Sequence, residues 1–152
     1  MKKREIVRKQ LDHKLLMFQK AGEVVPPASG WIYAFRYALN MSLRQLGKKL
    51  SITPQSVKEI EEREKNGTVS LKVLRQVASA MDMKFVYGFL PEDVTLKAMI
   101  EKRATQLAEK IVERTSIQME LEDQAVSDDW LEYSIAEKAE EIAKELPRVL
   151  WD

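Results

Sequence analysis

The sequence predicts a mainly α-helical protein: an N-terminal helix, a four-helix domain, one short β-strand and long C-terminal helices. Apolar residues recur at helical spacing along most of the 152 residues, and Ser, Thr or Pro precedes several of these stretches as a helix-start signal. One stretch alone, Lys84–Leu90, has the aromatic and β-branched composition of a strand. We therefore divide the chain into an N-terminal arm, a helical domain, a strand and an acidic helical region, at residues 1–25, 29–83, 84–91 and 92–152.

Residues 2–22 are the first predicted helix, and Val7 and Leu11 lie on its apolar stripe. The start of this helix is basic, which suits either an arm that touches DNA phosphates or a helix end in solvent. Pro26 and Pro27 then break the helix and begin a linker.

The stretch from Ser42 to Arg63 organises the rest of the chain, because it predicts two short helices joined by a tight turn. Ser42 and Thr53 are the expected N-caps, and Pro54 stands at the first position of the second helix, where its missing N–H costs nothing. Gly47 leaves room for the two helices to cross closely. The apolar residues form one inner seam: Leu43, Leu46, Leu50, Ile52, Val57 and Ile60. This is the pattern of a helix-turn-helix, which places its second helix in the DNA major groove; a compact helical hairpin is the alternative.

Helices at Trp31–Leu39 and Ser70–Met81 complete the expected four-helix set. Gly67 ends the helix that precedes the last of them. We expect Trp31 in the core of this domain instead of stacked on a base, and we place Arg36 on the outer side.

The strand predicted at Lys84–Leu90 has no second strand in the sequence to pair with. Pairing with the same stretch of a second copy gives a symmetric dimer, and an extended segment packed on its own domain is the alternative. The residues assigned to the dimer contact are Phe85, Val86, Tyr87 and Phe89.

Two long helices are predicted after Pro91. The first runs to about Glu122, and the second starts after the N-cap Ser127, beyond a break at 124–128. The tail, residues 148–152, is apolar and is expected to dock on this chain or on a partner. The second helix is expected to bury Trp130, Leu131, Ile135, Ala139 and Ile142.

Charge is divided unevenly along a chain of near-zero net charge. Residues 1–91 carry 17 Lys and Arg against 8 Asp and Glu, and residues 92–152 carry 8 against 16. The basic half suits contact with nucleic acid, which would repel the acidic half. The acidic helices are therefore expected to serve in dimer or protein-partner contact.

The residue inventory points away from an enzyme. The chain has no Cys and one His, and we find no glycine-rich phosphate loop and no paired carboxylates in an apolar setting. We expect no cofactor and no metal ion. No apolar run approaches the roughly 20 residues that span a membrane, and the N-terminus lacks the apolar region of a signal peptide, so we expect a cytoplasmic protein.

With these residues in view, the region 31–90 resembles helix-turn-helix domains of the Cro/repressor type. Over almost its whole length, the sequence is similar to the family called mobile mystery protein A. The matching stretches are KQLD (9–12), PPASGWI (26–32), LNMSLRQLGKKLSITPQSV (39–57), TVSLKVLRQVASAMDMKFVYGFLP (68–91), MELEDQ (119–124) and the terminal LWD. In that family the gene usually neighbours one for a Fic-domain protein, and the pair looks like a toxin–antitoxin module carried on mobile elements. The resemblance implies an antitoxin-like DNA-binding regulator, not an enzyme.

Two positions depart from the repressor pattern. Leu43 stands where such repressors commonly place a Gln that touches DNA, so contacts from the first helix of the pair fall to Arg44 or Lys48. Pro54 replaces a polar reader after the cap, which moves base reading further along the second helix. The expected base-reading residues are Gln55, Ser56, Lys58 and Glu59. The expected phosphate-contacting residues are Arg44, Lys48, Thr53 and Arg63.

The segment Ser116–Glu120 resembles the inhibitory helix of Fic inhibitors, which reads Ser or Thr, three residues, Glu, then Gly or Asn. In that mechanism the glutamate, here Glu120, blocks the nucleotide site of the partner. Leu121 departs from the last position, and with Met119 it also fits a core helix.

We thus expect a dimeric, sequence-specific autorepressor that reads a palindromic operator in double-stranded DNA and serves as the antitoxin of a Fic-domain toxin. The alternative is a protein-interaction inhibitor whose acidic C-terminal helices neutralise a partner, with DNA binding secondary.

Overall fold

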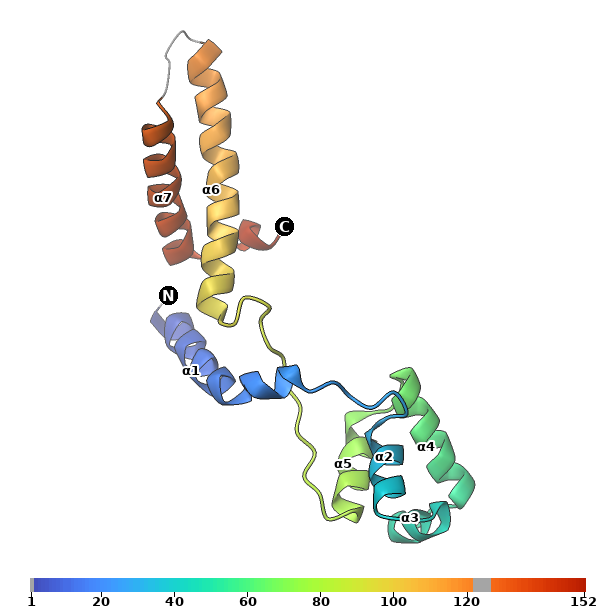
Figure 1. The fold of residues 1–152 in the computed structure, drawn as a ribbon. Helices are drawn as coiled ribbons and strands as arrows, with labels where there is room; N and C mark the ends of the chain where they lie inside the picture. The colour runs from blue at the N-terminus through green and yellow to red at the C-terminus, as the bar shows by residue number, and fades with distance from the viewer. Residues whose placement is uncertain (1, 122–126) are drawn as a thin grey trace. The chain divides into compact units, whose positions relative to one another are not determined.

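A computed structural model describes residues 2–121 and 127–152. The described part is mainly α-helical, which confirms the predicted class, and it divides into two compact units (Figure 1). One unit comprises Glu23–Gly88, and the other combines Met1–Gly22 with Phe89–Asp152.

The unit from Glu23 to Gly88 contains four helices. Each of the last three begins at a hydroxyl side chain that accepts a backbone N–H from its first turn: Ser42, Thr53 and Ser70. Gly67 ends one helix with a φ of 76°, a left-handed conformation that glycine adopts at low cost. The helices are α2 (Trp31–Ala38), α3 (Leu43–Leu50), α4 (Pro54–Asn66) and α5 (Leu71–Ala80).

All four helices contribute to one hydrophobic core. Its buried residues are Ile32, Leu46, Val57, Val77 and Met81, and Leu46 is completely shielded from solvent. The other members of the predicted seam, among them Leu43 and Ile52, are partly buried against this core. The expected burial of Trp31 is wrong: its side chain is 39% exposed and stacks on Phe35, because Ile32 takes the inward position of this short helix.

The described residues of the second unit form three helices and two short 3₁₀ segments. Its elements are α1 (Lys2–Phe18), the 3₁₀ segment Gln19–Glu23, α6 (Leu96–Leu121), α7 (Asp128–Glu145) and the 3₁₀ segment Arg148–Trp151. Helices α6 and α7 lie side by side (Figure 1). The Asp12 carboxylate of α1 accepts the backbone N–H groups of Leu96 and Lys97 at 2.7 and 3.2 Å, so it caps α6 from a distant part of the sequence.

Small residues bring α6 and α7 together. Ala104 and Ala108 are fully buried in their shared cluster, together with Ile100 and Ile142. Leu150 joins this cluster from the C-terminal 3₁₀ segment, so this residue of the apolar tail docks on its own chain, whereas Val149 and Trp151 stay exposed. Trp130 is 40% exposed, which contradicts its expected burial, because the seam uses residues further along α7.

The long helix begins at Leu96 and not at Pro91. The chain turns after Pro91, whose carbonyl oxygen accepts the N–H of Val94, and Thr95 caps the amide of Ala98. The predicted end at Glu122, and residues 124–126 of the predicted break, lie outside the described residues. Ser127 caps α7 as predicted.

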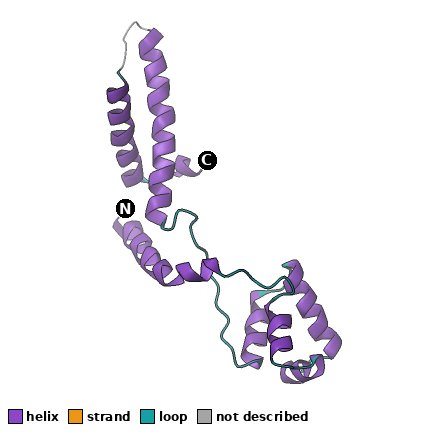
Figure 2. Cartoon of the chain, in the orientation of Figure 1, coloured by secondary structure: helices purple, strands orange, loops and turns teal. Residues whose placement is uncertain are grey.

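The predicted strand at Lys84–Leu90 is wrong for the single chain. Figure 2 shows helices and loops, and residues 84–91 carry no helix or strand assignment. A strand needs a neighbour to take its backbone hydrogen bonds, and the described residues of one chain offer none. Among the described residues, no helix is both long and apolar enough to cross a bilayer.

Candidate nucleic-acid interface

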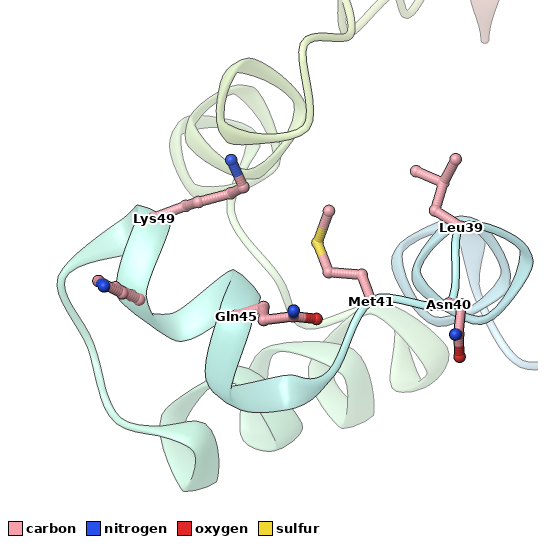
Figure 3. A pocket seen from close by; sticks show the side chains of 6 residues that line it. Leu39, Asn40, Met41, Gln45 and Lys49 are labelled. Carbon is pink, nitrogen blue, oxygen red and sulfur yellow. The ribbon is translucent and has the colours of Figure 1, made fainter.

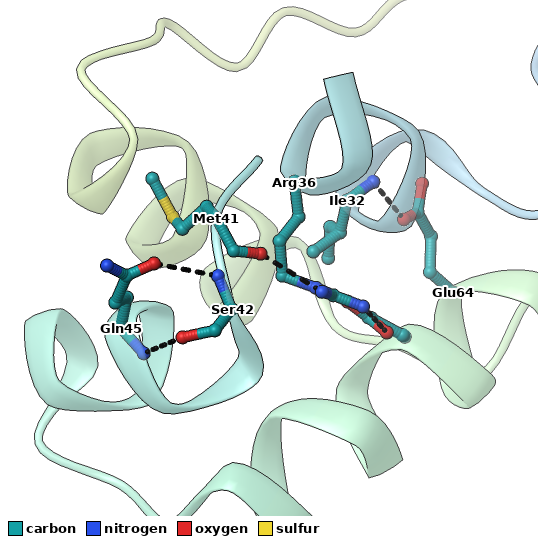
Figure 4. A network of polar contacts seen from close by, with 7 residues as sticks. Ile32, Arg36, Met41, Ser42, Gln45 and Glu64 are labelled. Atoms are coloured by element: carbon teal, nitrogen blue, oxygen red, sulfur yellow. Dashed lines mark hydrogen bonds and ion pairs between the residues drawn. The ribbon is translucent and has the colours of Figure 1, made fainter. Parts of the chain in front are cut away.

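The start of α3 is fixed by a reciprocal capping box. The Ser42 hydroxyl accepts the backbone N–H of Gln45 at 3.0 Å, and the Gln45 side-chain oxygen accepts the N–H of Ser42 at 2.8 Å (Figure 4). Thr53 caps α4 in the same way, with the N–H of Ser56 at 3.1 Å. Both helix starts are therefore set by local sequence.

The turn between α3 and α4 depends on Gly47. A methyl group added at this residue would lie 2.7 Å from the carbonyl oxygen of Ile52 and 3.4 Å from a methyl of Val57. The N–H of Ile52 donates to the Gly47 carbonyl at 2.9 Å, which closes the turn. Ser51 adopts a left-handed φ of 57° at the end of α3. This close contact fixes the angle at which α4 leaves the turn.

Helix α4 turns one face inward and leaves the opposite face in solvent. Val57 and Glu61 are buried. By the helical repeat, Gln55, Glu59 and Glu62 lie opposite them, at the centre of the exposed face. Sequence reasoning missed Glu62, whose exposed carboxylate makes this face less basic than expected.

The other predicted readers lie at the edges of that face. Lys58 is exposed on one side, and Arg63 is exposed on the other. Arg63 lies 3.7 Å from the Glu59 carboxylate, so these two side chains form a surface ion pair. Ser56 is half-buried, and its hydroxyl lies 2.9 Å from the Thr53 hydroxyl. Thr53 and Ser56 thus already have partners within the chain.

Positive charge on α3 lies beside this face. Arg44 and Lys48 are exposed, whereas Leu43 is half-buried against the core and cannot replace the polar residue of the repressor pattern. A hollow of about 510 Å³ separates the end of α2 from α3 (Figure 3). Its lining residues are Leu39, Asn40, Met41, Gln45, Lys48 and Lys49.

A buried ion pair anchors α4 from behind, and sequence reasoning missed it. The Arg36 guanidinium, expected on the surface, donates to Glu61 at 2.6 Å and to the Met41 carbonyl oxygen at 3.0 Å (Figure 4). Glu64 accepts the backbone N–H groups of Trp31 and Ile32 at 2.8 and 2.9 Å. The sequence does contain a signal for the inward position of these two glutamates, because Glu61 and Glu64 follow Val57 at the spacing of core positions on α4.

The other predicted sites lie elsewhere on the chain. Val86, Tyr87 and Phe89 are exposed, and Phe85 stacks on Tyr87 with ring centroids 5.8 Å apart. On α6, Ser116 is half-buried and Glu120 is exposed one turn later. Within the described ranges, no three His, Cys, Asp or Glu side chains gather in a way that could hold a metal ion.

No protein-family model, curated protein or solved structure matches this chain.

Proposed function

We propose that the protein is a sequence-specific DNA-binding transcriptional regulator that enters the major groove with α4 and represses its own operon. This proposal depends on one observation: in the α3–α4 pair, the inner side of α4 is held in place and its outer side is exposed. Gly47 and the Arg36–Glu61 ion pair hold the inner side of α4, and its first two turns present Gln55, Lys58 and Glu59 to solvent.

These side chains have the chemistry for base reading. The Gln55 amide can pair with adenine through two hydrogen bonds, and the Glu59 carboxylate can accept from the amino group of cytosine. Lys58 can donate to guanine or to a phosphate. Glu59 leaves its partner Arg63 when it binds a base, and Arg63 is then free to contact phosphate.

Arg44 and Lys48 supply phosphate contacts from α3, and Thr53 adds a hydroxyl beside them. These contacts offset the repulsion from Glu59 and Glu62 and set the register of α4 on the duplex. Two copies would read a palindrome, with recognition helices about 34 Å apart on one side of the duplex. The pairing of residues 84–90 across two copies stays a prediction.

Binding of the full chain to a labelled duplex from upstream of its own gene, with a scrambled duplex as control, tests this proposal. Specific binding should survive scrambled competitor at about 150 mM salt. If binding to both duplexes falls equally as salt rises, a basic surface that attracts phosphates would explain all of the binding. This result would contradict operator reading.

Substituting Gln55 by Ala should weaken operator binding by about 1–3 kcal/mol, the value of a bidentate base contact, with little effect on scrambled DNA. Lys48→Ala should weaken binding to both duplexes alike. It should also reduce the slope of log affinity against log salt concentration by about one. Lys110→Ala, an exposed lysine of α6, is the matched control and should change neither affinity. Equal losses for Gln55→Ala on both duplexes would exclude this residue as a base reader.

A second candidate function is neutralisation of a Fic-domain toxin by the acidic helices. The exposed Glu120 on α6, one turn after Ser116, supports it together with the family resemblance. Co-expression of the full chain with a Fic-domain protein from a neighbouring gene tests this function. If the Glu120→Ala variant still neutralises the toxin, the toxin contact would have to lie in another part of residues 92–152.

A further inference from the structure

We propose that residues 91–95 are a conformational switch that is coupled to the docking of α1. These residues form a strained turn while the Asp12 carboxylate caps α6. They become the first turn of a longer α6 when α1 leaves. The proposal concerns the unit of α1, α6 and α7, goes beyond the proposed function and does not depend on DNA binding.

The turn before α6 holds one residue in a conformation that it disfavours. Val94 has a φ of 75°, and a β-branched residue in the left-handed region is an outlier. The N–H of Thr95 donates to the carbonyl oxygen of Asp93 at 2.9 Å, so this bond closes a turn around Val94 alone. Such a turn with a positive φ at its centre is rare and strained. Because Val94 is 56% exposed, its side chain gains little core packing to offset the strain.

The local sequence favours a helix over the same residues. Pro91 suits the first position of a helix. Glu92 and Asp93 would then lie in the first turn, where the helix dipole attracts negative charge. This is why the sequence predicts the start of the long helix at Pro91. The observed turn therefore competes with a helix that the same residues encode.

Two backbone N–H groups decide between the turn and the helix. The N–H groups of Leu96 and Lys97 donate to the Asp12 carboxylate at 2.7 and 3.2 Å. In an α-helix that starts at Pro91, the same two groups would donate to the carbonyl oxygens four residues earlier, at 92–93. The Asp12 carboxylate takes the place of these carbonyl oxygens. Docking of Asp12 and a helix over residues 92–95 therefore exclude each other.

Two further contacts hold the turn and would be lost in the longer helix. Lys102 lies 3.3 Å from the Asp93 carboxylate. Residues nine apart in a continuous helix are separated by roughly 13.5 Å along its axis and point to opposite sides, so this ion pair would break. The Thr95 hydroxyl accepts the N–H of Ala98 at 3.0 Å, and in the longer helix that N–H would donate to the carbonyl oxygen of Val94. Side chains thus hold the turn, whereas backbone bonds would hold the helix.

Helix α1 is the element that can take Asp12 away from α6. None of its residues is buried, and a helix of this length without tertiary burial is marginally stable in water. Because docking of α1 and lengthening of α6 compete for the same amides, their coupling is reciprocal. A ligand that draws α1 away lengthens α6 by about one turn. The added turn is taken from the stretch that joins the two units, which meet in the sequence at residues 88–89.

Asp12→Ala should shift the switch to the helix, because the first two amides of α6 lose their acceptor. In the full chain, the Cα chemical shifts of residues 92–95 should move to helical values. The α1 amides should exchange with solvent about tenfold faster, because a released α1 is marginally stable. Glu5→Ala is the matched control, because the Glu5 carboxylate pairs with Lys9 inside α1. It should leave the shifts of residues 92–95 unchanged.

Val94→Gly should shift the switch to the turn. Glycine adopts a positive φ at little cost and is a poor helix former, so the turn is stabilised and the helix is destabilised. In the full chain α1 should be docked in a larger fraction of molecules, and its amides should exchange about tenfold more slowly. Val86→Gly is the matched control, because Val86 is exposed in a segment without helix or strand assignment. It should leave the exchange of α1 unchanged.

Thr95→Ala should shift the switch to the helix while Asp12 stays in the chain. The substitution removes the hydroxyl that caps Ala98 in the turn, and alanine is the better helix former. The Cα shifts of residues 92–95 should therefore move to helical values, by less than in Asp12→Ala. Thr105→Ala is the control, because the Thr105 hydroxyl bonds to a carbonyl oxygen within α6. It should change nothing at residues 92–95.

Amide exchange in the buried α6–α7 seam reports whether each variant keeps this unit folded. Random-coil shifts at residues 92–95 in Asp12→Ala, with the seam intact, would mean that the turn only unfolds and would overturn the proposal. Unchanged α1 exchange in Val94→Gly would also overturn it, because α1 and the turn would then be independent. If Asp12→Ala loses the seam, Thr95→Ala decides: random-coil shifts there contradict the switch, and helical shifts support it.

Discussion

The two units of this chain stabilise their helices in different ways. In α2–α5, three helices carry hydroxyl N-caps, one core takes residues from every helix, and a buried ion pair joins α2 to α4. In the unit of α1, α6 and α7, a narrow seam of alanines joins two long helices and leaves large apolar side chains in solvent. The difference lies in how the helices are joined, because both units leave large apolar side chains exposed, for example Tyr37 in the first and Tyr133 in the second.

The largest expected effect breaks the ion pair that distinguishes the first unit. Glu61→Ala leaves Arg36, whose side chain is 14% exposed, without its carboxylate partner and should lower the free energy of unfolding of α2–α5 by about 3–5 kcal/mol. Glu59→Ala removes the exposed pair with Arg63 and should cost less than about 1 kcal/mol. Hydrogen exchange resolved by helix measures both. Equal effects would mean that Arg36 finds a replacement partner.

An intermediate effect tests the alanine seam. Ala108→Leu adds volume at a fully buried contact between α6 and α7 and should destabilise that pair by about 1–3 kcal/mol. Ala136→Leu, at an exposed position of α7, should change stability by less than about 0.5 kcal/mol. Faster amide exchange in α6 and α7, with α2–α5 unchanged, would support independent units. Faster exchange in all helices would contradict the division.

The smallest expected effect concerns the caps. Thr53→Ala removes the acceptor for the N–H of Ser56 and should cost about 1 kcal/mol, with faster exchange confined to the start of α4. Ser79→Ala, at an exposed position late in α5, serves as the control and should be near neutral. A loss as large as that of Glu61→Ala would show that the turn between α3 and α4 depends on Thr53 beyond its cap.

Local signals explain what the sequence predicted well. The starts of α3, α4, α5 and α7 follow a Ser or Thr that reaches an amide three residues later. The Gly47 contact follows from spacing alone, since the turn brings Ile52 back onto α3. The exposure of Gln55, Lys58 and Glu59 follows from the inward positions of Val57 and Ile60.

The features that sequence reasoning missed depend on residues far apart in the chain. The polar side chain of Arg36 predicts an outer position, but its partner Glu61 lies 25 residues away in the sequence. The start of α6 depends on Asp12, 84 residues earlier, so the local Pro91 signal misplaced it. The residues at Lys84–Leu90 do favour a strand, but this segment forms no strand because the described residues provide no neighbouring strand to pair with it.

The contact of Asp12 with Leu96 has a consequence for synthesis of the protein. Helix α1 leaves the ribosome before α6, and the amides that Asp12 caps follow it 84 residues later. At about 5–20 residues per second, α1 waits roughly 4–17 s for them, while the whole of α2–α5 emerges and can fold. During this time the nascent chain is expected to hold a folded α2–α5 unit and an α1 whose Asp12 has no amide to bind. Chaperones and proteases would then act on α1 before they act on α2–α5.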